Sequence, residues 1–244
     1  MNIFGDIETL PDQREGARER HLLMAQENFK APSSLTKTQA LDDLRGKGVT
    51  YDKDGKFVAA DQVKLDWEDA FKEDLAEVVG EESYRKTALT DDGTICVVCV
   101  KGIKGTSILK LGDSEETLLY NAFSEIRILC GQREPYFIGH NIPWDLERLY
   151  HKAVILGVDP GFKLPFDGRH GQHYYDTMQA WAGFKKQISQ DNLCKALGIQ
   201  GKPDDIDGSR VWDVWQTDPE RVAAYCLDDV NKVEMIYNRL NFGG

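Results

Sequence analysis

The chain has 244 residues, of which 41% are hydrophobic, and this is enough for one large or two small domains with a real core. It contains no run of about 18 apolar residues, which a membrane-spanning helix needs. A net charge of −11 argues against a protein that coats nucleic acid by neutralising its phosphates. The same charge leaves open an enzyme that grips a few nucleotides through metal ions, since such ions are the largest local charges.

The first residues lack the basic-then-apolar segment of a secretion signal, so we expect a cytoplasmic protein. Five cysteines, an odd number, fit reduced thiols better than a disulfide framework. Cys96 and Cys99 have the spacing of half a zinc site, but no second pair follows at metal spacing. They lie in a strand-like run, where positions three apart face opposite sides, and buried packing is the better interpretation.

The first third of the chain is one strand followed by a long polar region. The strand covers residues 2–9, and residues 13–29 predict a weak helix. Pro32-Ser33-Ser34 predicts the cap of a second helix, and Asp66 predicts the start of the strongest one. The predicted apolar face of that third helix consists of Trp67, Ala70, Phe71, Leu75, Val78 and Val79.

Strands and helices alternate after this region. Turns at Asp92-Gly93 and at Gly102 and Gly105 bound two strand-like runs, and residues 136–139 form a short buried one. Helices are predicted from Asp113 or Ser114 to Cys130, up to Gly157, near residues 177–184, from Ser189 to Leu197, and onward from Asp218-Pro219. We therefore expect an α/β fold with a mixed central sheet flanked by helices. Residues 1–244 would form a single domain, in which 11–90 are a mostly helical insertion after the first strand.

Two carboxylates stand at the end of the first strand. Asp6 and Glu8 are two residues apart, so in a β-strand both project to the same side, about 7 Å apart along it. Such a pair beside apolar neighbours is self-repelling and resists burial, and a divalent cation removes both costs. The alternative is a solvated strand end, which is the commoner outcome for an isolated Asp-x-Glu.

The last predicted helix carries a carboxylate within its apolar stripe. At spacings of four and three, one face holds Val222, Cys226, Asp229, Val233, Ile236 and Leu240. Burial of Asp229 requires a cation or hydrogen-bond donors, and Tyr225, four residues earlier, reaches the same place. Ordinary packing is the alternative for Tyr225. Asp228 lies off the stripe and is expected in solvent.

A fourth acid, Asp145, stands at a helix start just after the strand at residues 136–139, and His140 and Asn141 precede it. Helix capping is the plain alternative, but a strand exit is the usual place for a site in an α/β protein. Carboxylates from the first strand, this helix start and the last helix can converge. Oxygen ligands without paired His or Cys select hard cations, Mg²⁺ or Mn²⁺, and suit two-metal phosphoryl chemistry.

These motifs resemble those of the DEDD 3′→5′ exonucleases. The three parts are Asp-x-Glu at residues 6–8, His-Asn-x-x-x-Asp at 140–145, and Tyr-x-x-x-Asp at 225–229. The tyrosine, with no His in that region, indicates the DEDDy branch. Residues 4–9, 206–209 and 225–230 look most like stand-alone exonucleases related to the proofreading domain of family-B DNA polymerases.

The resemblance covers residues 1–10 and 88–240. It departs from the family pattern at Ile142-Pro143-Trp144, which replaces the commoner Gly-x-Phe, although Asp145 itself is present. It implies a ribonuclease H-like fold and release of 5′-mononucleotides from the 3′ end of single-stranded DNA, or of frayed ends. A ribonuclease of the same fold is one alternative, because contacts to the sugar 2′ position cannot be read from sequence. The other is a nucleic-acid-binding or assembly module with an inactive site.

The resemblance also implies roles for five residues and a cofactor of two Mg²⁺ or Mn²⁺ ions. By it, Asp6 bridges both ions, while Glu8 and Asp229 hold the first. Asp145 holds the second, and Tyr225 orients the attacking water. Two-metal catalysis places the ions about 3.5–4 Å apart, one activating the water and the other stabilising the leaving oxygen.

Substrate contacts are predicted mainly from residues 183–202, which are locally basic. This segment carries Lys185, Lys186, Lys195 and Lys202 against a single acid, Asp191. A solvated face is the alternative. Asn141 is expected at the 3′-terminal nucleotide, with a helix cap as its alternative.

Several other residues have a plainer interpretation. Asp176, with Gln179 three residues later, has the pattern of a capping box and is interpreted as structural. The rings of Phe4, Trp144 and Trp181 can stack on bases, but apolar packing is the safer interpretation.

Overall fold

The computed structural model describes residues 1–51, 55–56, 58–131, 133–201 and 206–243, which form two compact units. The first comprises Met1–Leu10 and Leu89–Gly244, and the second comprises Pro11–Ala88. Among the described residues, no helix is long and apolar enough to cross a membrane. That residues 1–244 work as one domain stays a prediction.

A mixed sheet forms the centre of the first unit. Its strands are β1 (Asn2–Leu10), β2 (Thr94–Gly102), β3 (Gly105–Lys110), β4 (Tyr136–Gly139) and β5 (Tyr174–Asp176), in the order β3-β2-β1-β4-β5. The first three strands pair antiparallel, whereas β4 and β5 continue parallel to β1. The predicted mixed α/β sheet is therefore confirmed. The sequence pattern misses β5, because three residues are too short for a periodic signal.

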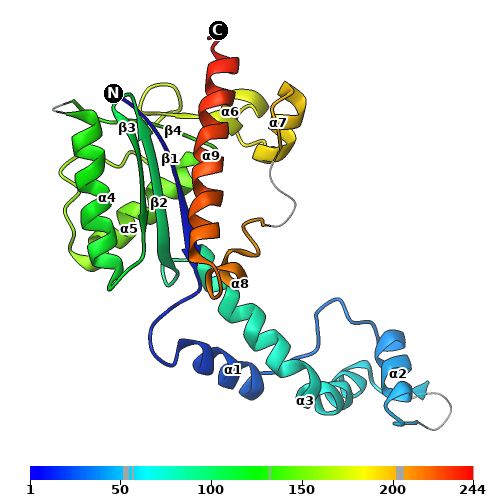
Figure 1. Ribbon diagram of the computed structural model, residues 1–244. Helices are drawn as coiled ribbons and strands as arrows, with labels where there is room; N and C mark the ends of the chain where they lie inside the picture. The colour runs from blue at the N-terminus through cyan, green and yellow to red at the C-terminus, as the bar shows by residue number, and fades with distance from the viewer. Residues whose placement is uncertain (52–54, 57, 132, 202–205, 244) are drawn as a thin grey trace. The chain divides into compact units, whose positions relative to one another are not determined.

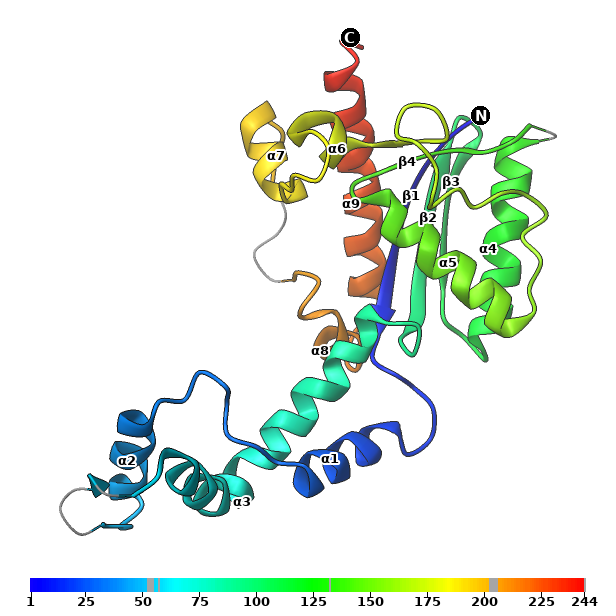
Figure 2. The same ribbon diagram turned by 180° about the vertical axis from the view of Figure 1, so that it is seen from behind.

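Helices cover both faces of this sheet (Figures 1 and 2). They are α4 (Glu115–Cys130), α5 (Ile142–Leu156), α6 (Thr177–Ala182), α7 (Gln190–Leu197), α8 (Val211–Trp215) and α9 (Pro219–Leu240). The α4 and α5 side has a core that includes Ile7 and Phe123, and the α8 and α9 side has one that includes Phe4 and Cys226. Side chains of β1 thus alternate between two cores, so the strand is buried on both faces.

Helix ends in this unit follow the predicted chemistry. Ser114, rather than Asp113, caps α4, while Ser189 caps α7 and Asp218 caps α9. Gly157 ends α5 in the left-handed conformation that a side chain disfavours, with φ 69°. The short helix α8 is not predicted, because five residues carry too little periodicity.

A β-bulge interrupts the pairing of β1 with β2 beside one of the acids. The register shifts between Glu8 and Thr9, so that Cys96 is an extra residue on β2. This bulge overturns the expectation that Cys96 and Cys99 face opposite sides, since both are buried in the core on the α9 side. The cysteines are free thiols.

The second unit is helical, with α1 (Ala17–Glu27), α2 (Lys37–Gly46) and α3 (Ala60–Lys86), followed by a short 3-10 helix at Thr87–Leu89. Its core stacks the ring of Trp67 against those of Phe29 and Phe71. The predicted cap at residues 32–34 is wrong. Thr36 caps α2 through a capping box with Gln39, because this pair has the Thr-x-x-Gln spacing that satisfies two backbone N–H groups.

The long helix α3 differs from its prediction in the residue at which it begins and in the residues that it buries. It begins at Ala60, ahead of Asp66, and Val78 and Val79 are exposed rather than inward. The cause lies at Gly80, where an added Cβ would stand 2.8 Å from the Cα of Leu22 on α1. Close approach of the α1 backbone turns the face containing Gly80 inward, and the two valines therefore point away.

Candidate active site

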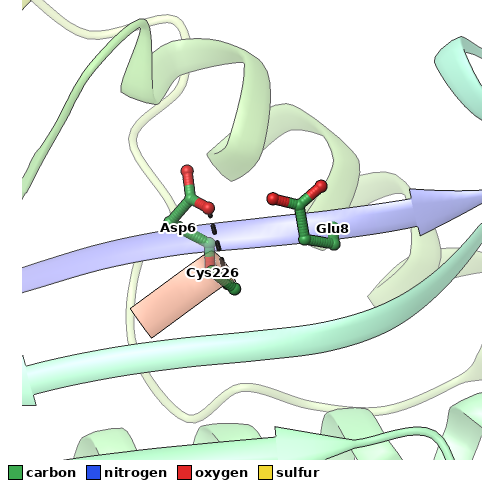
Figure 3. Close-up of side chains that lie close together, drawn as sticks. All are labelled: Asp6, Glu8 and Cys226. Atoms are coloured by element: carbon green, nitrogen blue, oxygen red, sulfur yellow. Dashed lines mark hydrogen bonds between the residues drawn. The ribbon is translucent and has the colours of Figure 1, made fainter. Parts of the chain in front are cut away.

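The two acids of β1 lie side by side along the strand, next to Cys226 of α9 (Figure 3). One ligand atom from each of Asp6, Glu8 and Cys226 lies within 4.8 Å of the other two. The Cys226 thiol donates a hydrogen bond to Oδ2 of Asp6 at 3.4 Å. Burial, contact with Cys99 and the charges of the two acids raise the pKa of Cys226. It therefore stays a protonated donor that orients Asp6, and the oxygens are the metal-binding atoms of this group.

Asp145 reaches β1 from the start of α5. β4 pairs with β1 only at residues 2–4, and farther along β1 the N–H of Ile7 donates to Oδ1 of Asp145 at 3.2 Å. The carboxylate thus takes the place that a longer β4 would occupy. Burial raises the pKa of Asp145 well above its ordinary value, and the charge of Asp6 raises it further. The like charges of Asp6 and Asp145 repel each other, and a bound cation would relieve that repulsion.

The turn from β4 into α5 is tight enough to require glycine. A Cβ on Gly139 would lie 2.6 Å from Cδ1 of Ile142. Asn141 follows with φ 60° at the N-cap position, but its side chain makes no capping hydrogen bond. The capping alternative for Asn141 is therefore wrong. Its side chain is exposed at the start of the helix that carries Asp145.

Asp176 holds this turn from the neighbouring strand. It is buried at the end of β5 and caps α6 by accepting the N–H of Met178 at 3.0 Å. The same oxygen accepts the N–H of Asn141 at 2.8 Å. These two backbone donors account for a buried carboxylate and support the structural interpretation of Asp176.

The last helix presents its tyrosine and its inner acid to the sheet. Tyr225 and Asp229 are both buried, and the tyrosine hydroxyl hydrogen-bonds the Asp229 carboxylate. Burial raises the pKa of Tyr225, and the charges of Asp229, Glu8 and Asp6 raise it further. The hydroxyl is therefore affected by the charges of Asp6 and Glu8 on β1 as well as by that of Asp229 on its own helix.

Asp228 has a different environment from its neighbour in the chain. Its side chain is 40% exposed, and its carboxylate forms an ion pair with Lys232, whose side chain is only 5% exposed. The expectation of an outward Asp228 matches this exposure, but it misses the ion pair. Residues four apart share a helix face, so the sequence does contain a signal for the pair.

Gln190, the buried first residue of α7, is a further residue that the sequence reasoning misses. Its Nε2 donates to the backbone carbonyl of Asp229 at 3.0 Å, so α7 braces α9 at the inner acid. Nothing in the local pattern marks this role, because a polar residue after the Ser189 cap is usual in a first helical turn.

The predicted basic segment is only partly free to bind an anion. Lys185 and Lys186 are exposed, whereas Lys195 forms an ion pair with Asp191 at 2.6 Å. Lys202 lies outside the described residues. Two lysines of the segment therefore remain as candidates for substrate contact.

The donor set fits a hard divalent cation. Asp6 and Glu8 offer carboxylate oxygens within 4.8 Å of one another, and Asp145 and Asp229 are two further buried carboxylates. In the described part of the chain, neither Asp145 nor Asp229 belongs to the group within 4.8 Å. The structure thus brings the two β1 acids together directly, and it links the other two through Ile7 and Tyr225.

Comparisons with known proteins bear on the family to which the chain belongs. A search of curated proteins found no match. The family model described as "Predicted 3'-5' exonuclease related to the exonuclease domain of PolB" matches residues 82–243. That match confirms the resemblance and the ribonuclease H-like fold. It omits β1, yet β1 pairs with β2 and β4 inside the matched region. The chain belongs to the family of predicted 3′-5′ exonucleases related to the exonuclease domain of PolB.

Proposed function

We propose that this protein is a metal-dependent 3′→5′ exonuclease that hydrolyses single-stranded DNA or frayed 3′ ends to 5′-mononucleotides by a two-metal mechanism. One observation carries the proposal. The ligand oxygens of Asp6 and Glu8 lie within 4.8 Å of each other, in the same electrostatic neighbourhood as the hydrogen-bonded pair of Tyr225 and Asp229. Family membership supports the reaction class, and this arrangement of acids supports the proposal that the reaction takes place beside them.

Four acids would hold two Mg²⁺ or Mn²⁺ ions, namely Asp6, Glu8, Asp145 and Asp229. When bound, such ions supply an activated water and stabilise the leaving 3′ oxygen. In the absence of ions, burial and the charge of Asp6 raise the pKa of Asp145, so it holds a proton more readily than an ordinary carboxyl does. Metal binding would therefore release protons, as binding to ionised carboxylates requires.

Tyr225 would act by orientation. Its pKa is raised by burial and by the surrounding acids, so the hydroxyl keeps its proton at neutral pH and is not a general base. The hydrogen bond to Asp229 holds that proton and leaves the oxygen lone pairs to accept from the attacking water. A fixed acceptor of this kind positions the nucleophile before reaction.

The substrate strand would be held by three further side chains. Asn141, exposed at the start of α5, would contact the 3′-terminal nucleotide, and Lys185 and Lys186 would contact the phosphate backbone. A chain of net charge −11 has little general attraction for DNA, so these local contacts and the metal ions would provide the affinity.

The test is hydrolysis of a 5′-labelled single strand with Mg²⁺ or Mn²⁺. The proposal expects a ladder that shortens from the 3′ end, 5′-mononucleotides as product, and loss of both in EDTA. A duplex with a mismatched 3′ end should be shortened faster than a fully paired one. Asp6→Asn should be inactive, with Asp228→Asn as the matched control.

Other outcomes assign other functions. Degradation of RNA alone would make the protein a ribonuclease of the same fold. Purified wild-type protein that is inert on DNA and RNA with both metals would overturn the proposal in favour of a binding module with an inactive site.

A further inference from the structure

The segment between α6 and α7 presents an aromatic ring and two cations to solvent. Phe184 is 75% exposed, and Lys185 and Lys186 follow it. The N–H of Lys186 donates to the carbonyl of Gly183 at 3.2 Å, which closes a turn, and within it Lys185 has φ 60°. Glycine is the usual residue at that φ, so a lysine there is unfavourable for folding. Such residues gather at functional sites, where the side chain has another use.

These charges are uncompensated in the part of the chain that the structure describes, since no carboxylate there pairs with Lys185 or Lys186. The Lys185 ammonium lies 5.4 Å from the centroid of the Phe184 ring, and the ring remains mostly exposed even so. Cations next to an exposed ring match a ligand that alternates phosphates with flat bases, which is single-stranded nucleic acid.

The other end of this segment, with the first residue of α7, is hydrogen-bonded to the turn that precedes α5 and to α9. Nε2 of His140, at the exit of β4, lies 2.9 Å from the carbonyl of Ile188, and Gln190 donates to the carbonyl of Asp229 at 3.0 Å. Each residue spans at most about 3.6 Å, so Phe184 lies no more than roughly 14 Å from Ile188. The exposed turn therefore stands within a few nucleotides of the candidate active site.

We propose that Phe184, Lys185 and Lys186 form a binding site for the nucleotides that precede the 3′ terminus of a DNA single strand. The ring of Phe184 stacks on a base, and the two ammonium groups contact the flanking phosphates. This inference rests on the proposed function and deepens it, because stacking requires a base that is not already paired. The site gives an acidic protein a means to prefer single strands over duplex ends.

The first test is binding, measured by fluorescence anisotropy of a labelled single strand whose 3′-terminal linkages are phosphorothioates that resist hydrolysis. Phe184→Ala should weaken binding about 5- to 150-fold, the range for loss of one stacked base. Phe184→Trp should bind within a few-fold of wild type. Tyr120→Ala is the matched control, since Tyr120 is an aromatic residue 62% exposed on α4, on the other face of the sheet, and should change nothing.

The lysines are tested by the salt dependence of that affinity. Lys185→Gly removes the cation and places glycine at the φ that suits it, so the turn is kept. Combined with Lys186→Ala, it should lower the slope of log K against log salt by about 1.4, at roughly 0.7 per phosphate contact on a single strand. Lys104→Ala, which removes an exposed cation between β2 and β3, should leave the slope unchanged.

Substrate length separates this site from the reaction centre. If Phe184 binds nucleotides farther from the 3′ end than a dinucleotide extends, Phe184→Ala should hydrolyse a dinucleotide as wild type does while losing kcat/KM on a 20-nucleotide strand. An unchanged affinity for the long strand, or an equal loss on both substrates, would overturn the inference and leave the exonuclease proposal standing. Wild-type protein that binds strands through Phe184 without hydrolysing them would overturn the proposed function alone.

Discussion

Two groups of buried charge in the first unit are built in opposite ways. One joins α5 to α4, where Nζ of Lys152 lies 3.2 Å from Oε2 of Glu115. The other carboxylate oxygen accepts the N–H of Ile95 on β2 at 2.7 Å. Both side chains are nearly buried, and the chain itself supplies the cation. This group is an ion pair that links α5 to α4 and β2, and its two charges balance each other.

The acids around β1 form the other group, and their effect on each other is unfavourable. Asp6 adds to the raised pKa of Asp145, and Asp229, Glu8 and Asp6 add to that of Tyr225. A fold selected only for stability avoids such a concentration of one charge. The proposed metal site accounts for this contrast, because a cation from solution would balance the acids of this group.

The largest expected effect is on activity. Asp229→Asn should lower metal-dependent hydrolysis by several orders of magnitude, since it removes charge from an ion that activates the nucleophile. Asp228→Asn should change the rate by less than tenfold but lower the melting temperature, because it leaves the buried ammonium of Lys232 without its partner. Both variants are measured on the same single strand. If Asp228→Asn is the inactive one, the assignment of the inner acid and of Tyr225 is wrong.

Breaking the ion pair of Lys152 and Glu115 should affect stability rather than activity. Lys152→Met leaves the Glu115 carboxylate buried without its cation and should lower the free energy of unfolding by about 3 kcal/mol. Denaturant unfolding measures this, and the rate per folded molecule should stay near wild type. Adding Glu115→Gln should restore part of the loss, because the lone charge is then gone. No recovery in the double variant would mean that packing, and not charge, accounts for the effect.

A smaller effect is expected at the tyrosine. Tyr225→Phe keeps the ring in place and deletes only the hydroxyl that bonds Asp229. It should lower kcat by up to about 100-fold, the scale for misplacing a reacting group, and leave the melting temperature nearly unchanged. A large drop in melting temperature at unaltered kcat would assign the hydroxyl a structural role.

The smallest effect is a dependence of stability on pH in EDTA. The folded state raises the pKa of Asp145 above its ordinary 3.8, so between these two values the folded state binds more protons than the unfolded state. The contribution of Asp145 to the free energy of unfolding is therefore fully present below the ordinary pKa. It is lost as pH rises through the raised pKa. Unfolding of wild type and Asp145→Asn across pH measures this contribution. Identical slopes would show that the Asp145 carboxyl does not carry this penalty.

The strand and helix pattern of the first unit could be predicted from the sequence because its elements are long, periodic and capped. Ser114, Ser189 and Asp218 each stand before a helix, and the α9 stripe places Asp229 inward. The short elements β5 and α8 could not be predicted, since each is too short to show a period and neither is a continuous apolar run like that of β4.

Contacts between distant segments are the part that the sequence does not reveal. Gln190 reaches the Asp229 carbonyl, and Asp145 accepts from Ile7, across loops whose path no local pattern specifies. The acids could be proposed because unusual residue types stood in apolar settings. The residues that hold these acids in place could not be predicted. Gln190, for example, looks like any polar residue in a first helical turn.

The central claim is that the acids of β1 and α9 form a divalent metal site, and thermal unfolding of wild type and Asp6→Asn with increasing Mn²⁺ tests it directly. At one hundred times the dissociation constant, one bound ion stabilises by about 2.7 kcal/mol, or roughly 5–10 °C for a chain of this size. Wild type and Asp228→Asn should show this rise. Asp6→Asn should show little of it, and should melt no lower than wild type in EDTA because repulsion is relieved. A rise in Asp6→Asn equal to that of wild type would contradict the claim.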